Sequence, residues 1–339
     1  MHIAIVGAGL SGLICAHQLQ EQGNTVIVYE KSAAAGGRMG TRQTELGGFD
    51  HGAQYFTASS GPFKQAVVGW RKAGLVAPWG GKLVVLDNGE VHPAARSAAL
   101  LKQRFVAVPG MNALAHHLAQ GVDLRTEQAV RKIESHGDHQ WLLKIASSGT
   151  PIDASAGPFD AVIMATPAPS AAALLAVAPK LADEAARVRY APCWSLMLGF
   201  PMPLELGFDG AWVEGSRLSW IARDSSKPKR RAGEHWVAHA SGAWSDEHFE
   251  DDEERAREKL LKAFRDATGS EVQPLYVSLH RWSSAQALDP LERNCLWDGA
   301  SRIGACGDWC AAGLEGAGRI ENAYLSGLAM AEALRLAVH

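Results

Sequence analysis

The chain has 339 residues, enough for about two domains and at least one large hydrophobic core. Hydrophobic residues make up 47% and charged residues 20%, a profile typical of folded globular proteins, so disorder over most of the chain is excluded. The net charge of −3 provides no excess of positive charge. We therefore expect neither a nucleic-acid partner nor a polybasic attachment to membranes.

The five cysteines are scattered and odd in number, so they predict no disulfide framework. Cys306 and Cys310 lie four residues apart, but no second pair completes a zinc site, and we expect no metal. The thiols are interpreted as reduced, which favours a cytoplasmic protein. The first apolar run belongs to a folded motif and not to a secretory signal. The longest uncharged stretch, residues 161–179, contains three prolines and is not expected to span a membrane.

The chain opens with a strand–helix–strand pattern. Residues 3–6 form a wholly apolar run, as expected for a parallel strand covered on both faces. A glycine-rich turn follows, then a predicted helix over residues 10–22 and a β-branched strand over residues 25–29. Residues 33–57 show little periodicity and predict a loop. This arrangement is typical of the start of a nucleotide-binding fold.

Elements of both kinds follow along the chain. We expect a helix at 62–73 and another that follows Pro109-Gly110 and ends near 121, a hairpin at 82–92, a meander at 130–145 and a buried strand at 160–165. Tryptophan-rich strands are predicted at 194–200, 218–223, 236–240 and 277–282, interrupted by a helix at 249–267. A strand at 301–305 and a helix at 316–336 end the chain. The basic loop 227–231 is expected to be solvated, although it could also meet an anionic substrate.

The glycines of the first turn carry the clearest chemical signal. Gly7, Gly9 and Gly12 form a G-x-G-x-x-G motif between a strand and a helix. The first glycine allows the tight turn, the second lets a pyrophosphate approach the backbone, and the third lets the helix pack on the strand. Glu30, at the end of the second strand, is placed to bind ribose hydroxyls. The motif predicts a dinucleotide site without distinguishing NAD from FAD.

A second glycine pair distinguishes the two cofactors. The run Gly36-Gly37-Arg38-Met39 resembles that of flavoproteins in the amine oxidase superfamily, in which the arginine contacts the FAD pyrophosphate. A guanidinium fork suits phosphate oxygens in shape and charge. The resemblance therefore implies FAD as the cofactor, bound without a covalent link.

Other segments extend this resemblance. Residues 49–57 resemble the segment that passes the flavin ring, residues 165–167 the strand end that closes on FAD, and residues 304–308 a second FAD fingerprint. The helix opening at 319–323 resembles one whose amides face the flavin. The resemblance implies that the following residues bind the cofactor: Gly7, Ala8, Gly9, Leu10, Ser11, Gly12, Glu30, Lys31, Gly37, Arg38, Met39, Ala53, Gln54, Tyr55, Phe56, Val130, Ala165, Gly307, Asp308, Arg319, Ile320 and Asn322.

Within the superfamily, segments 50–57, 220–228, 280–282 and 306–310 most resemble the renalase-like flavoproteins. The implied fold class is α/β: a Rossmann-like FAD-binding domain with an inserted α+β substrate domain, whose antiparallel sheet roofs the flavin. The FAD-binding domain would comprise residues 1–57, 96–170 and 296–339. The substrate domain would comprise residues 58–95 and 171–295. A glycine-rich insertion at 313–318 departs from the family pattern just before the flavin-facing helix.

The renalase resemblance implies oxidation of dihydronicotinamide substrates, which are isomers of NADH or NADPH reduced at an unusual ring carbon. Hydride transfer to flavin N5 would release NAD(P)⁺, and O₂ would reoxidise the flavin to give H₂O₂. The residues expected to bind substrate are Gln54, Tyr55, Trp220, Arg223, His239, His280 and Trp282. The tryptophans and histidines among them could instead be core residues.

No clear candidate is seen for the lysine that many amine oxidases carry near flavin N5, and no essential side-chain base is expected. Two alternatives stay open at this point. One is an amine oxidase or a desaturase-type enzyme, and the other is a flavin-binding sensor with little turnover.

Overall fold

The computed structural model of the protein describes residues 1–94, 102–137, 139–147, 154–310 and 319–338. Its first large sheet has six strands in the order β19-β20-β13-β1-β2-β9. These strands are β1 (His2–Val6), β2 (Thr25–Tyr29), β9 (Asp123–Arg125), β13 (Ala161–Met164), β19 (Leu296–Asp298) and β20 (Ile303–Ala305). All neighbours pair in parallel except β19 and β20. A parallel sheet covered on both faces explains the continuous apolar runs in β1, β13 and β20.

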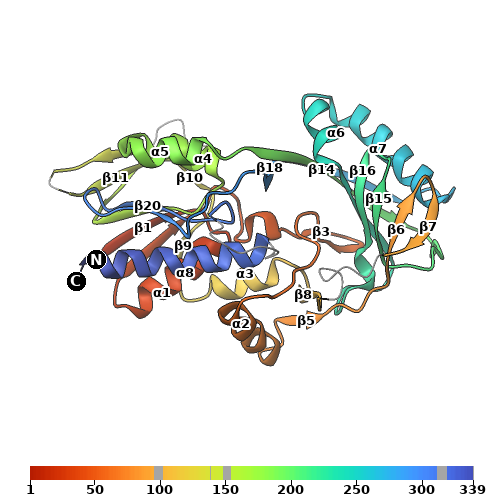
Figure 1. Cartoon of the computed structure of the whole chain (residues 1–339), viewed down its shortest axis with the longest axis horizontal. Coiled ribbons are helices and arrows are strands. Elements are labelled where there is room, and N and C mark those ends of the chain that lie inside the picture. Colours follow the sequence, from red (N-terminus) through yellow and green to blue (C-terminus); the bar gives the residue numbers. More distant parts are fainter. Residues whose placement is uncertain (95–101, 138, 148–153, 311–318, 339) are drawn as a thin grey trace.

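Helices cover one face of this sheet. Ile3 and Ile5 of β1 pack against α1 (Leu10–Glu21) and α8 (Arg319–Val338), which lie side by side (Figure 1). A Cβ atom at Gly327 of α8 would lie 2.5 Å from the Ser11 carbonyl oxygen of α1, so only glycine lets the two helices approach this closely. The helices α2 (Gly61–Lys72) and α3 (Ala113–Leu118) pack beside this pair, and the short hairpin β5 (Val76–Pro78) and β8 (Phe105–Ala107) packs next to α2.

The other face is covered by a three-stranded antiparallel sheet and two helices. Ala4 and Val6 of β1 belong to this second core. The elements are β10 (Gln128–Ser135), β11 (Trp141–Ser147), β12 (Ala154–Phe159), α4 (Ala168–Leu174), the 3₁₀ turn η2 (Leu175–Val177) and α5 (Pro179–Ala186). Alternate residues of a single strand thus enter two different cores, as the pleat of a strand requires.

A seven-stranded sheet forms the other end of the molecule (Figure 1). Its strands, in the order β18-β14-β17-β16-β15-β6-β7, are β6 (Leu83–Asp87), β7 (Glu90–Pro93), β14 (Tyr190–Phe200), β15 (Gly210–Glu214), β16 (Leu218–Arg223), β17 (Glu234–Ala240) and β18 (Tyr276–Ala287). All neighbours are antiparallel except β15 and β6, which run parallel. The strand β6 belongs to the hairpin β6–β7, which precedes the other strands of this sheet in the chain and joins the sheet at its edge, beside β15.

The two faces of this sheet differ. Helices α6 (Gly242–Glu247) and α7 (Glu253–Thr268) cover one face, where Trp194, Leu196 and Ile221 are buried. The opposite face meets the small hairpin β3 (Arg42–Thr44) and β4 (Gly47–Phe49) and the segment that follows it. This second face therefore looks toward the glycine-rich part of the chain.

The predicted α/β class, with a Rossmann-like sheet and a largely antiparallel sheet, is confirmed. Residues 33–57, expected as a loop, contain the short hairpin β3–β4 and the 3₁₀ turn η1 (Gly37–Met39). The helix expected from residue 249 begins at Glu253, because the Asp252 side chain accepts a hydrogen bond from the Arg255 amide and caps it. The helix expected from residue 316 is described from Arg319 onward. Among the described residues, no helix is long and apolar enough to cross a membrane.

Candidate functional site

Four of the predicted motifs lie at one edge of the six-stranded sheet. The glycine turn follows β1, Glu30 follows β2, Ala165 follows β13 and Cys306 follows β20. These strands are adjacent and parallel, so the residues that follow them meet at the carboxyl edge. Ligands of doubly wound α/β sheets bind at this edge. The sheet therefore gathers four segments that are distant in sequence into one candidate site.

The first glycine turn has the conformation that its sequence predicts. Gly7 has a φ of 109°, which side chains rarely adopt, and a Cβ atom there would meet the Ala165 carbonyl oxygen at 2.8 Å. A Cβ atom at Gly12 would collide with the Gly7 carbonyl oxygen. Gly9 caps α1 without a side-chain hydrogen bond, and a Cβ atom there would have nothing within 4 Å. The helix N-terminus thus stands open, as an approaching phosphate needs.

Glu30 is buried beside this turn. Its carboxylate accepts hydrogen bonds from the Ala8 amide at 2.9 Å and the Ser32 amide at 2.8 Å, which fix its position. The Gln128 amide donates to the Glu30 carbonyl oxygen, which brings the start of β10, with the half-buried Val130, next to the acid. The neighbouring Lys31 is exposed and makes no such contact.

The second glycine pair packs on the first. The Gly36 amide donates to the Ala8 carbonyl oxygen, and a Cβ atom at Gly37 would lie 3.8 Å from the Gly9 Cα. Arg38 donates from both terminal nitrogens to Asp308, at 2.8 and 2.7 Å. The structure thus joins Arg38, which the resemblance assigns to the pyrophosphate, to Asp308, the acid of the second FAD fingerprint, for which the resemblance implies contact with the ribityl or pyrophosphate region.

The remaining predicted cofactor residues line the same region. Leu10 and Ser11 are buried in α1, Met39 is buried behind the second glycine pair, and Ile320 is buried in α8. The Ala53 amide donates to the Arg38 carbonyl oxygen, the Phe56 amide to the Phe105 carbonyl oxygen, and the Gly307 amide to Ser326 Oγ at 3.0 Å. Arg319 opens α8 and donates to Gln286 at 3.1 Å.

Two buried polar atoms show that the site can hold a further group. Thr166 Oγ1, at the end of β13, and Asn322 Oδ1, in the first turn of α8, have no hydrogen-bond partner among the described residues. Buried polar atoms are almost always paired, so a bound dinucleotide is a suitable partner for both. The insertion at 313–318 lies outside the described residues. With the open helix end and the Arg38 guanidinium, the residues present fit FAD.

The segment after β4 is anchored by a buried charge cluster. Asp50 accepts from Lys227 Nζ at 3.2 Å and from Arg230 at 2.6 Å, and Lys227 also donates to Asp224 at 2.5 Å. All four side chains are at most 2% exposed. We call Asp50, Asp224, Lys227 and Arg230 the charge cluster. The expectation that this basic loop is solvated is wrong for Lys227 and Arg230, because each is held by buried carboxylates.

The charge cluster sets the protonation of its acids. Burial alone would raise the pKa of Asp50, but Lys227 and Arg230 outweigh it and lower the pKa to about 2. Burial and the neighbouring Asp50 charge raise the pKa of Asp224. Lys227 also donates to Gln54 Oε1 at 3.2 Å, so its three N–H groups have three acceptors. Its ammonium therefore acts as a donor that positions the segment.

The predicted substrate residues on the sheet form a row across four strands. Ser195 of β14 lies opposite His280 of β18 and His239 of β17, and His239 lies opposite Trp220 of β16. We call His280, Ser195, His239 and Trp220 the sheet row. Because neighbouring residues such as Trp194 pack toward α7, the row occupies the opposite face. The sheet thus brings together three of the predicted residues and adds Ser195.

Residues 51–55 lie across the sheet row. The His51 ring contacts His280 at 4.7 Å and stacks on Trp282 at 5.2 Å, measured between ring centroids. Trp282 Nε1 donates to the His51 carbonyl oxygen at 3.0 Å. At the other end of the row, the Tyr55 ring lies 5.7 Å from Trp220. These contacts place residues 51–55, part of the segment expected to pass the flavin ring, directly against the predicted substrate face.

The histidines at this contact are neutral at ordinary pH. Burial, His280 and Arg42 lower the pKa of His51 to about 4. Burial lowers the pKa of His239 to about 4 and, with Arg42, also lowers the pKa of His280. Neutral imidazoles can donate at one nitrogen and accept at the other. The face is therefore polar but uncharged.

Two predicted substrate residues lie apart from the sheet row. Arg223 follows Trp220 by three positions, so its side chain is on the other face, where it pairs with Asp209 at 2.5 Å. Gln54 is buried, and its amide donates to the Asp50 and Gly52 carbonyl oxygens while accepting from Lys227. The side chains of both are committed to protein partners.

The sequence reasoning did not single out Ser195, His51 or Lys227 as site residues. The signal for Ser195 was a lone hydroxyl within the otherwise apolar predicted strand 194–200. The signal for Lys227 was its spacing of three residues from Asp224, which a single turn, η3 (Asp224–Ser226), brings into contact. Both signals become distinctive only when burial is known.

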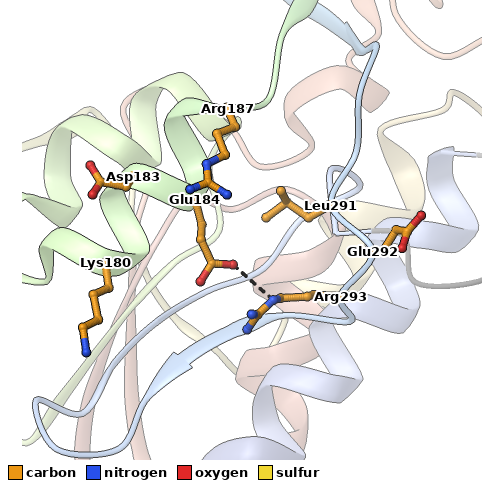
Figure 2. Close-up of a pocket in the computed structure, with 7 residues that line it drawn as sticks. All are labelled: Lys180, Asp183, Glu184, Arg187, Leu291, Glu292 and Arg293. Atoms are coloured by element: carbon orange, nitrogen blue, oxygen red, sulfur yellow. Dashed lines mark ion pairs between the residues drawn. The ribbon is translucent and has the colours of Figure 1, made fainter.

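A surface recess of about 520 Å³ lies elsewhere, between α5 and residues 291–293 (Figure 2). Glu184 and Arg293 form an ion pair across it at 3.1 Å. None of the predicted site residues lines it, and its mixed charges are typical of a solvated surface. In the part of the chain that the structure describes, no group of three or more potential metal ligands occurs.

Comparison with known families agrees with this geometry. The profile of the flavin-containing amine oxidoreductases matches residues 87–335, and that of the NAD(P)-binding Rossmann-like domain matches residues 5–68. An Arabidopsis thaliana protein assigned as the flavin-containing monooxygenase FMO GS-OX-like 11 is 42% identical over 36 residues. That match covers 11% of this chain and only 21% of the plant protein.

Solved structures share the fold over nearly the whole chain. A protein assigned as a protoporphyrinogen oxidase from Exiguobacterium sp. 255-15 superposes with a TM-score of 0.74 at 13% identity, covering 99% of both chains. Putrescine oxidase bound to putrescine gives 0.73 at 14% identity, with the same coverage. Cyclohexylamine oxidase from Brevibacterium oxydans IH-35A gives 0.71 at 15% identity, covering 98% and 99% of the two chains. The chain therefore belongs to the flavin-containing amine oxidoreductase family, and the protein is an FAD-dependent oxidoreductase.

Proposed function

We propose that the protein is a renalase-like oxidase of dihydronicotinamide nucleotides. The overall reaction would convert an NAD(P)H isomer, O₂ and a proton to NAD(P)⁺ and H₂O₂. Bound FAD would accept the hydride at N5 and pass the electrons to O₂. Residues 58–95 and 171–295 would supply the substrate side, and the rest of the chain would hold the cofactor.

One observation supports this proposal most. Residues 51–55 and the sheet face against which they pack together carry flat aromatic rings and neutral imidazoles: Tyr55, Trp220, His239, His280 and Trp282. A nicotinamide ring is flat and uncharged in its dihydro form, so it suits stacking and edge contacts with such side chains. The role of the protein would be to hold the donor carbon about 3–3.5 Å from the acceptor atom.

The charge cluster is consistent with a reaction that needs no base. A dihydropyridine already carries its hydride on a saturated ring carbon, and its loss restores aromaticity without removal of an N–H or O–H proton. Lys227 is the buried lysine that contacts residues 51–55, through Gln54. Its three N–H groups are hydrogen-bonded to Asp50, Gln54 and Asp224. In this arrangement Lys227 serves as a hydrogen-bond donor that positions residues 50 and 54.

Amine oxidation is the second candidate, favoured by the family to which the chain belongs. An amine substrate is an ammonium ion at neutral pH, and binding it in that form needs a carboxylate or an aromatic cage. The sheet row contains no carboxylate, and Asp50 is held by Lys227 and Arg230. Trp220 of the row and Trp282 beside His280 would have to form such an aromatic cage for an amine to bind.

Anaerobic mixing separates these functions. The holoprotein would be mixed without oxygen with the 2- and 6-dihydro isomers of NADH and NADPH, and separately with putrescine, cyclohexylamine and benzylamine. We expect rapid bleaching of the flavin absorbance by a dihydronicotinamide isomer, and H₂O₂ on admission of air. Bleaching by amines alone would favour the second candidate. Absence of bleaching by either class would indicate a flavin-binding sensor.

We also propose that FAD is held without a covalent bond. Cys306 lies within the second fingerprint and Cys310 follows it, and the two are only 0% and 3% exposed. Cys310 is the less deeply buried of the two. Burial raises the pKa of its thiol, so little reactive thiolate forms. Acid precipitation should release all the yellow colour into the supernatant. Flavin that stays on the precipitated chain would contradict this expectation.

A further inference from the structure

Tyr190 is the first residue of β14 and lies in the part of the chain expected to form the substrate domain. It pairs with Ala287 of β18. Its half-buried ring packs against the core that contains Met164, the last residue of β13, and Trp309, which follows β20. The ring of Tyr190 is therefore at the carboxyl edge of the six-stranded sheet, where the cofactor residues gather.

The Tyr190 side chain contacts two segments of the candidate cofactor site. The guanidinium carbon of Arg38 lies 5.9 Å from the centre of the Tyr190 ring. The Ala168 amide, directly after the segment 165–167 that resembles the strand end closing on FAD, donates to the Tyr190 hydroxyl at 3.4 Å. Arg38 in turn donates to Asp308. Three side chains from distant parts of the chain, those of Tyr190, Arg38 and Asp308, thus meet at this edge.

The Tyr190 hydroxyl still has a proton to donate. A phenol oxygen can accept a hydrogen bond and donate one. The oxygen accepts from the Ala168 amide, and within the described ranges no residue accepts its proton. Burial, and then the charge of Asp308, raise the pKa of Tyr190, so the phenol keeps its proton at ordinary pH. Arg38 has five N–H groups, of which Asp308 takes two. Both side chains therefore offer donors to one further acceptor.

We infer that the Tyr190 hydroxyl donates a hydrogen bond to the pyrophosphate of FAD, beside Arg38, so that β14 of the substrate domain forms part of the cofactor site. A hydrogen bond to an anionic phosphate oxygen is stronger than one between neutral groups. The Arg38 side chain is 30% exposed and Tyr190 is half-buried, so each keeps a face that a bound group can cover.

This inference goes beyond the proposed function, because it concerns the cofactor and holds for any substrate. It rests on the expectation that Arg38 faces the pyrophosphate. The strand β14 continues from Tyr190 to Ser195 of the sheet row. One strand would therefore connect the cofactor site with the predicted substrate face, although the two lie in different expected domains.

The test compares two flavins that differ in their phosphates. The apoprotein would be titrated with FAD and with riboflavin, which lacks the pyrophosphate, while flavin fluorescence is recorded. Tyr190→Phe keeps the ring beside Arg38 and removes only the hydroxyl. It should raise the Kd of FAD roughly ten- to a hundredfold, as for a hydrogen bond to a charged group, and leave the Kd of riboflavin unchanged.

Tyr276→Phe is the matched control. Tyr276 is the first residue of β18, and its ring stacks on Phe49 at 5.4 Å between centroids. It pairs with Gly199, at the opposite end of β14 from Tyr190. The control should change neither Kd.

Thermal unfolding of the apoprotein separates a ligand contact from a role in the fold. Tyr190→Phe should change the Tm by no more than about 3 °C, as for one neutral hydrogen bond in a chain of this size. A much larger fall, or an apoprotein that does not fold, would assign the hydroxyl to the fold and overturn the inference.

The binding results have clear opposite outcomes. An equal rise in the Kd of FAD and of riboflavin would place the contact away from the phosphates and overturn the inference. FAD affinity that is the same in Tyr190→Phe and Tyr276→Phe would overturn it too. If Arg38→Ala weakened both flavins equally, the expectation for Arg38 would fail and the inference with it. The anaerobic bleaching of the wild type tests the proposed function separately, and none of these results decides it.

Discussion

Arg38 and Asp308, 270 residues apart in the sequence, form a two-pronged ion pair at the edge of the six-stranded sheet. The Asp308 side chain is 4% exposed and the Arg38 side chain 30% exposed. Burial alone would lower the pKa of Arg38, but the adjoining carboxylate raises it. The pair holds the guanidinium beside the two glycine turns, where a pyrophosphate would approach.

We expect Arg38→Ala to weaken FAD binding. Loss of a hydrogen bond to a charged group costs about 1.5–3 kcal/mol, which corresponds to a Kd roughly ten- to a hundredfold higher. Titration of the apoprotein with FAD, followed by flavin fluorescence, would measure the change. Arg42→Ala is the control, because Arg42 donates to Ser278 Oγ at 2.7 Å, on β18 and away from the glycine turns. Equal losses in the two variants would reject the assignment.

Lys227→Met should destabilise the fold. It leaves Asp50 and Asp224 short of a counter-charge in a buried site, and removal of one partner from such a site costs about 3–5 kcal/mol. Chemical denaturation at pH 7 would give the change in the free energy of unfolding. Lys229→Met, at an exposed position of the same loop, should change it by less than about 0.5 kcal/mol. A small effect at Lys227 would show that the charge cluster is not structurally important.

The neutral histidines predict a loss of stability in mild acid. The pKa of His51 and that of His239 fall from the ordinary 6.5 to about 4 in the folded protein. Between these values the unfolded chain binds the proton and the folded one does not. The free energy of unfolding should therefore fall as the pH drops from 6.5 toward 4, by at most about 3 kcal/mol for each histidine.

Denaturation curves at several pH values would test this expectation. His239→Gln should flatten the dependence by removing one titrating group. His136→Gln, at an exposed turn, should leave the pH dependence as in the wild type. A wild-type stability that stays constant from pH 6.5 to pH 4 would mean that these imidazoles titrate normally in the folded state.

The reductive half-reaction is expected to proceed without a side-chain base. His280→Ala, His239→Ala and Tyr55→Phe should change substrate affinity and alter the anaerobic rate of flavin reduction only modestly. Stopped-flow absorbance across pH would measure both quantities with FAD still bound. A loss of about 10⁴-fold in the rate for any one of them, the upper end for general acid or base catalysis, would move the amine oxidase function ahead.

The sequence alone determined the nucleotide half of the site, because its chemistry depends on local backbone geometry. Gly7 and Gly12 are needed where a side chain would collide with a carbonyl oxygen, and such a requirement leaves a short, readable motif. The apolar runs of β1 and β13 likewise predict buried parallel strands. The resemblance of the second glycine pair then identified the flavin family, which the family profile confirms.

Only the tertiary structure decided which side chains share the substrate face. Whether Ser195 and Trp220 point toward α7 or toward residues 51–55 depends on the pleat and register of β14 and β16, and a shift of one residue would reverse both. The burial of charged side chains is likewise a property of the tertiary structure. In the sequence Lys227 is typical of a solvated loop, but in the structure long-range packing buries it against Asp50. Strand register and burial are properties of contacts between distant segments, so no local pattern in the sequence could determine them.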